Sequence, residues 1–215
     1  MLEKEKKKPW RALAGAVIVL SVAAIAGQSV LSSLNATAFN TSPQNVNSGT
    51  LSLNLSSTSP STGFSTSITN MAPGDVVNRY VTLTNNGTLD GINMSLQTAE
   101  TGTATLISDT GTAKALVLTV KSCSVAWTQG TGTCSGTPNT EIAGAALGSY
   151  SVAKAFANGT LSASAVKYLQ VSLQLPDQNE TTVNGVQPTT TIQGGNVYIT
   201  YTFNFAQRNA TTTNS

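Results

Sequence analysis

Two cysteines are the residues of this chain whose spacing suggests a definite chemistry. Cys123 and Cys134 are the only cysteines, and they flank a Gly- and Thr-rich stretch, SVAWTQGTGT, that can fold back and bring the two thiols together. In an oxidising compartment such a pair forms a disulfide, which would fix a hairpin. A zinc site is not indicated, because there is neither a C-x₂₋₄-C knuckle nor a histidine. We therefore expect a structural disulfide, with two reduced, buried thiols as the alternative.

Few residues of this chain are of types that commonly carry out catalysis. The chain contains no histidine, which is the commonest general base and the commonest zinc ligand. The acidic residues beyond the N-terminal region are scattered without a D-x-D run or EF-hand spacing: Asp75, Asp90, Glu100, Asp109, Glu141, Asp177 and Glu180. We therefore expect no enzyme activity, no cofactor and no metal site. A carboxylate pair that meets only in the fold, as in glycosidases, is the enzymatic alternative.

The N-terminus has the organisation of an export signal. Residues 1–11 are basic, and residues 12–26 form an apolar stretch typical of a secretory signal helix. This stretch is shorter than the roughly 20 residues that span a bilayer, so an uncleaved anchor is the alternative. Cleavage could follow Ala26, or it could follow Ala38 in the motif that begins at Ala36. In either case we expect the downstream chain to be exported, to the cell surface or the medium.

Charge is concentrated in this leader. Charged residues make up only 9% of the chain, against about 25% in an average soluble protein. After residue 11 the basic and acidic residues nearly balance, and no basic patch is left that could bind nucleic acid. We expect contact with a membrane only through an uncleaved signal segment.

The rest of the chain alternates apolar and polar residues with the period of a β-strand. Seven or eight strands are predicted, over residues 51–56, 65–70, 76–85, 92–97, 114–127, 169–175 and 197–205. Turn residues separate them, as at Pro73-Gly74-Asp75 and Asn86-Gly87. Residues 140–165 are rich in Ala and Gly, and we expect a loop there with a possible short helix. The pattern predicts an all-β, antiparallel domain.

An ordered set of short motifs resembles the TasA/camelysin family of secreted biofilm-fibre (spore-coat-associated) proteins. The motifs are SGTLSL from Ser48, MAPGD from Met71, TNNGTL from Thr84, Leu175-Pro176, IQG from Ile192 and FAQ from Phe205. The resemblance implies a single jelly-roll-like β-sandwich over residues 39–215, preceded by an N-terminal signal helix. It also implies a mature chain that starts near an aromatic residue. Cleavage between Ala38 and Phe39 is therefore favoured, giving a signal peptide of residues 1–38 and an N-terminal extension of residues 39–47.

The same resemblance implies subunits that polymerise by donating an N-terminal strand to the next copy. The donor would be the segment Phe39–Asn47, including Asn40 and Val46. We therefore expect a non-enzymatic, secreted subunit of extracellular filaments or biofilm matrix that associates with itself and is processed by a signal peptidase. The alternative is a monomeric cell-surface module that binds glycans or proteins. Some members are described as metallopeptidases, but without histidine or clustered carboxylates we expect no protease activity.

Overall fold

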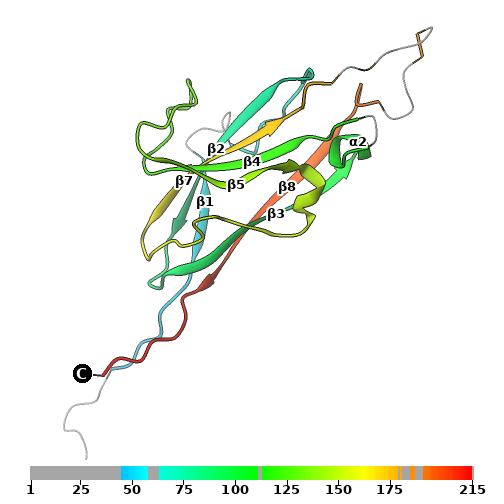
Figure 1. Cartoon of the computed structure of the whole chain (residues 1–215). Coiled ribbons are helices and arrows are strands. Elements are labelled where there is room, and N and C mark those ends of the chain that lie inside the picture. Colours follow the sequence, from blue (N-terminus) through cyan, green and yellow to red (C-terminus); the bar gives the residue numbers. More distant parts are fainter. Residues whose placement is uncertain are drawn as a thin grey trace, which may run out of the picture. The chain divides into compact units, whose positions relative to one another are not determined.

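Figure 1 shows the computed structural model, which describes residues 45–57, 63–110, 113–178, 180, 185–186 and 191–214. Residues Ser48–Ser215 form one compact unit, and Met1–Asn47 form another. Of the N-terminal unit, Met1–Asn47, only residues 45–47 are described, and they are exposed. The predicted signal helix and the predicted boundary after residue 38 therefore lie outside the described residues. Within the described ranges, no helix has the length and apolarity needed to cross a bilayer.

The unit that starts at Ser48 is a jelly-roll-like β-sandwich of two antiparallel sheets, which confirms the predicted fold class. The five-stranded sheet has the order β1-β2-β7-β4-β5, and the three-stranded sheet has the order β6-β3-β8. The strands are β1 (Leu53–Ser56), β2 (Val76–Asn85), β3 (Gly91–Gly102), β4 (Val117–Cys123), β5 (Pro138–Ala146), β6 (Lys154–Ala155), β7 (Val166–Gln174) and β8 (Val197–Gln207). A helical turn, α2 (Ala104–Ile107), and a 3₁₀ turn, η1 (Leu147–Ser151), lie between strands.

The core lies between the two sheets. It is filled mainly by side chains at alternate positions along the strands, which face inward. Its largest fully buried apolar side chains are Tyr150, Leu83, Met94, Leu96, Leu118, Leu147, Leu169, Val120 and Val171. Burying an aliphatic side chain of this size stabilises the fold by roughly 1.5–3 kcal/mol. Tyr150 satisfies its polar end by donating its hydroxyl to the Leu118 carbonyl at 2.6 Å. Burial raises the pKa of this hydroxyl to about 12.

Three predicted elements differ from the structure. Residues 65–70 are not a strand, and the strand expected over residues 114–127 is limited to β4. The segment expected to be a loop with a possible helix, residues 140–165, instead contributes most of β5, all of η1 and β6. Ala and Gly have weak strand propensity, so local sequence gave no signal for β5. Pairing with β4, through two register shifts, overrides that propensity.

Candidate functional site

The residues predicted to be cleaved or donated precede the sandwich. Ala36, Ala38, Phe39 and Asn40 lie outside the described residues, so their assigned roles stay predictions. Val46 is described, and its side chain is 83% exposed. This residue of the predicted donor segment is therefore accessible to another molecule.

The turn between β2 and β3 holds the chain where it enters and where it leaves the sandwich. Thr50, just before β1, accepts a hydrogen bond at its carbonyl from the Thr88 N–H at 2.9 Å. Arg208, just after β8, donates its N–H to the Asp90 carbonyl at 2.8 Å. Gly87 is required in this turn, since an added Cβ would lie 2.4 Å from the Thr50 carbonyl oxygen. The chain therefore enters β1 and leaves β8 at the same end of the sandwich.

One side of the sandwich, which we call the open side, is bordered by strand edges that lack a strand partner among the described residues. β8 is an edge strand, because it pairs with β3 alone. β1 pairs only with residues Thr82–Asn85 of β2, which leaves β2 residues 76–81 without a strand neighbour on that side within the described ranges. Such edges present rows of N–H and C=O groups that can pair with another chain.

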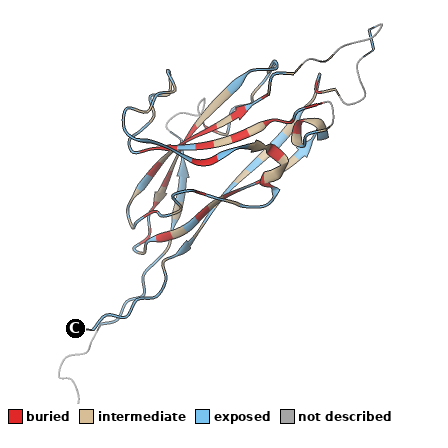
Figure 2. Cartoon of the chain, in the orientation of Figure 1, coloured by how far each residue is buried: buried red, intermediate tan, exposed pale blue. Residues whose placement is uncertain are grey.

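The core is covered less completely along β8 than along its neighbour β3. The inward-facing Met94 and Leu96 of β3 have no exposed surface. The inward-facing residues of β8 are all only half-buried, although they pack against the core: Val197, Ile199, Tyr201, Phe203 and Phe205. Figure 2 shows β8 as an alternation of half-buried and exposed residues, with no buried residue along its length. Apolar surface therefore remains accessible beside the free edge of β8.

A segment without regular secondary structure, Gly63–Met71, partly covers the open side, and we call it the cover segment. The Phe64 ring stacks on the Tyr201 ring of β8, with centroids 4.1 Å apart and planes 11° apart. Ile68 and Met71 are half-buried and pack against the core. Because this segment lies between β1 and β2 in the chain, the Phe64–Tyr201 stack joins the connection between two strands of the five-stranded sheet to β8 of the three-stranded sheet.

Charged groups from both sheets act on Tyr201. Burial raises the pKa of the Tyr201 hydroxyl, the charge of Arg79 lowers it, and the charge of Glu100 raises it, with burial the largest effect. The Arg79 guanidinium also donates to the Thr66 carbonyl of the cover segment at 2.8 Å. Glu100 accepts a hydrogen bond from the Thr98 hydroxyl. The open side therefore combines aromatic surface with one basic and one acidic side chain.

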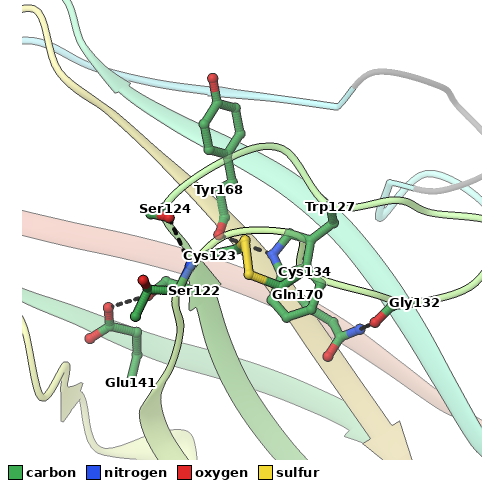
Figure 3. Close-up of a disulfide and its surroundings, with 10 residues drawn as sticks. Ser122, Cys123, Ser124, Trp127, Gly132, Cys134, Glu141, Tyr168 and Gln170 are labelled. Atoms are coloured by element: carbon green, nitrogen blue, oxygen red, sulfur yellow. Dashed lines mark hydrogen bonds between the residues drawn. A yellow bond between two sulfur atoms is a disulfide. The ribbon is translucent and has the colours of Figure 1, made fainter.

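A disulfide joins Cys123 to Cys134, which confirms the predicted pairing, and the two Cα atoms are 5.8 Å apart. The loop that it closes is fastened to the outer face of the five-stranded sheet by Trp127, whose indole N–H donates to the Tyr168 carbonyl at 3.2 Å (Figure 3). The Trp127 ring lies 6.2 Å from the Tyr80 ring, measured between centroids. The disulfide therefore fixes a hairpin against the sheet.

A buried ion pair lies at the inner face of the five-stranded sheet. The Lys167 ammonium is 3.0 Å from the Glu141 carboxylate, and the two side chains are 9% and 1% exposed. The carboxylate also accepts hydrogen bonds from the Ser122 hydroxyl at 2.7 Å and from the Asn158 N–H at 2.8 Å. Lys167 donates to the Asn158 carbonyl at 2.9 Å. The network ties the Asn158 loop to β4, β5 and β7.

Glu141 should make the folded state sensitive to acid. Burial raises the pKa of its carboxyl, but hydrogen bonds from Ser122 and the Asn158 N–H, together with Lys167, outweigh burial and hold the pKa below its ordinary value. A pKa lower in the folded than in the unfolded state adds stability above the unfolded pKa, and that stability is lost as pH falls through the folded pKa. We expect the free energy of unfolding to decrease when the pH is lowered below about 4.5, which is near the unfolded pKa of Glu.

Urea titrations at several pH values would measure this dependence. The matched control is Glu141→Gln, which cannot titrate at this position and should lose less stability on acidification than the wild-type chain. Equal acid sensitivity of the two chains would show that other carboxyls are responsible.

Fold and site together define an all-β sandwich protein with one disulfide and one incompletely covered side. Over residues 6–212 the chain matches the family described as Camelysin metallo-endopeptidase, and it belongs to this family. This match confirms the resemblance that the ordered motifs indicated. A search of curated proteins found no match.

The family description corrects our expectation that the chain is not an enzyme, because it names a metallo-endopeptidase and so points to a protease. Within the described ranges, no group of three or more Cys, Asp or Glu side chains is placed to hold a metal ion, and the chain has no His. Glu141 is paired with Lys167, and Glu180 accepts hydrogen bonds from Thr191 and from the Ile192 N–H. The described residues therefore do not fit a peptidase metal centre, and they define no catalytic step.

Two features of the structure were missed by reasoning from sequence. Lys167 is in phase with Leu169 and Val171, so the alternation did place a lysine on the inward face of a strand. A buried lysine requires a partner, which is the signal that could have led to an acidic residue. Phe64 is the only aromatic residue in the Ser- and Thr-rich stretch of residues 56–70. A single aromatic residue among polar residues could have indicated that its ring packs against the core.

Proposed function

We propose that this chain is exported and serves as a subunit of extracellular filaments or matrix, in which copies join by β-strand donation. The predicted donor is the segment Phe39–Asn47, and the acceptor is the open side of another copy. Export would follow from the N-terminal signal segment, with removal of residues 1–38 by a signal peptidase. Secretion is compatible with membership of the camelysin family and with the disulfide, a bond that persists in oxidising compartments.

The observation that carries this proposal is the free edge of β8. This strand is 11 residues long, and its sequence, VYITYTFNFAQ, contains no charged residue and no proline. Small β-proteins usually protect a long edge with lysine, proline or a covering element, because an unprotected edge associates with other chains. An added strand would satisfy the backbone groups of β8 and cover the half-buried residues on its inner face.

The position of the chain entry also supports strand donation. Thr50 is fixed to the β2–β3 turn, and the end of β8 is fixed to the same turn through Asp90 and Arg208. Thr50, near the start of the sandwich, and Arg208, just after β8, are therefore held by the same turn. A head-to-tail contact between one copy's extension and the next copy's edge generates an open filament when the rotation from copy to copy does not close a ring.

Size-exclusion chromatography and negative-stain microscopy of purified chain beginning at Phe39 would test the proposal. We expect a population that elutes as polymer and appears as filaments of uniform width. A chain that stays monomeric at every concentration would contradict assembly, and it would favour a surface module that binds glycans or other proteins.

Peptidase activity is a second candidate function, favoured by the family match over residues 6–212. Incubation of the purified chain with azocasein, with and without a chelator, would test it. Chelator-sensitive release of peptides would assign the family's activity to this chain. Cleavage that persists in the chelator would point to a contaminating protease of another class.

A further inference from the structure

The open side has a feature that strand donation alone does not explain. A core surface meant only for another copy would be left bare in the single chain, yet here the cover segment Gly63–Met71 lies on it. Phe64 supplies a full aromatic stack on Tyr201 and comes within 6.4 Å of the Phe203 ring, measured between centroids. The chain therefore shields part of its own free edge.

The cover is incomplete, and it does not replace a strand. The segment contains no β-strand, and it pairs with neither β8 nor residues 76–81 of β2 in the described sheets. Phe64, Ile68 and Met71 remain half-buried, and the other described residues from Ser65 to Asn70 are exposed. A strand from another molecule would pair with the edge backbone and bury the same apolar surface, so it can compete with this cover.

Hydrogen bonds attach the cover segment to β2, and another closes the turn that follows the segment. The Arg79 guanidinium donates to the carbonyls of Thr66 and Ser67, at 2.8 and 3.4 Å. The second distance is long for a strong hydrogen bond. At the C-terminal side, Asp75 accepts the Ala72 N–H at 2.7 Å in the turn before β2, and this turn can stay in place if the preceding residues move.

We propose that the cover segment is an intramolecular shield of the strand-acceptor site: Phe64 closes the open side in the single chain and is displaced when a strand from a second copy pairs with β8. This inference rests on the proposed function, because it assigns a regulatory step to the same assembly site. Displacement of the shield would set the rate at which subunits join. It would also keep newly exported chains from associating before a donor strand is in position.

The first test is Phe64→Ala, measured as the lag time of filament formation by light scattering. Phe64 is half-buried, so removing the stacked ring should favour the uncovered state by about three- to tenfold, roughly half the free-energy effect of losing a fully buried apolar side chain. The lag should shorten by about the same factor. The matched control is Val152→Ala, which removes an apolar side chain that is 73% exposed and lies outside the open side, and which should leave the lag unchanged.

The second test locks the cover in place with the pair Phe64→Cys and Tyr201→Cys. When the new disulfide has formed, as checked by mass spectrometry, assembly should stop, and a reductant should restore it. Wild-type chain in the same reductant controls for loss of the native disulfide, and each single cysteine variant controls for loss of the stack. If the bond does not form, the Phe64→Ala lag still decides the question.

The outcomes separate the shield from the proposed function. If the wild-type chain forms no filaments, the proposed function fails and the shield fails with it. If the wild-type chain assembles, but Phe64→Ala has an unchanged or longer lag, or the locked pair assembles normally, only the shield is overturned.

Discussion

Replacing Lys167 with Met is expected to lower the free energy of unfolding by about 3 kcal/mol or more at neutral pH. Methionine is close to lysine in volume, so the main effect is the loss of the ammonium beside a carboxylate that is 1% exposed. Breaking a buried ion pair by removing one partner leaves an uncompensated charge, which typically costs about 3–5 kcal/mol. Urea unfolding followed by circular dichroism would measure the change.

The double variant Glu141→Gln/Lys167→Met is the matched control for this prediction. It removes both charges and keeps side chains of similar size, and replacement of a whole buried pair is often nearly neutral. We expect it to recover most of the lost stability. If Lys167→Met alone costs less than about 1 kcal/mol, the pair is solvated like a surface pair and does not hold the Asn158 loop.

Removing the disulfide with Cys123→Ser and Cys134→Ser should lower the free energy of unfolding by about 3 kcal/mol. The bond joins residues separated by 11 positions, and closing a loop of this size restricts the unfolded chain by about that amount. Thermal unfolding would report a lower midpoint, and the Trp127 fluorescence should change, because this residue anchors the hairpin to Tyr168.

Reduction of the wild-type chain supplies the control for the disulfide. A reductant should lower the midpoint of the wild-type chain towards that of the double serine variant, and it should leave the variant itself unchanged. Equal midpoints for the oxidised wild-type chain and the variant would show that the hairpin is held by its contacts with Tyr80 and Tyr168 and gains nothing from the bond.

The strands whose residues alternate strictly were predictable from sequence. The phase of Leu169, Val171 and Leu173 in β7 matches their burial, and so do the apolar and polar faces of β8. In β8 one face is packed and the other is exposed, so the pattern directly reflects the fold. In β7 the polar Gln170 is buried as well, at 6% exposure, which the alternation did not predict. The disulfide was predictable because only one pairing of two cysteines exists.

The remaining features depend on contacts between residues distant in sequence. β5 is a strand because β4 provides a partner, although its Gly and Ala residues have weak strand propensity. Glu141 meets Lys167 across three strands, 26 positions along the chain. The open side follows from the sheet order, which places β8 and the short β1 at edges. None of these relations is encoded in a local pattern.

The proposed role in assembly is compatible with the absence of charge along β8. An edge that accepts a strand should be free of lysine and proline, and β8 has neither over its full length. Many small β-proteins use charged edges to stay monomeric. Here the cover segment, with Phe64 on Tyr201, supplies the shielding that charges provide in those proteins.

Negative-stain microscopy of chains with and without the segment Phe39–Asn47 tests strand donation most directly. The comparison uses three purified chains. The first is residues 39–215 and the second is residues 48–215. The third is residues 39–215 with residues 39–47 replaced by a Gly/Ser segment of equal length. We predict filaments from the first chain alone, with the other two remaining as folded single particles. Filaments from residues 48–215 would contradict donation by this segment.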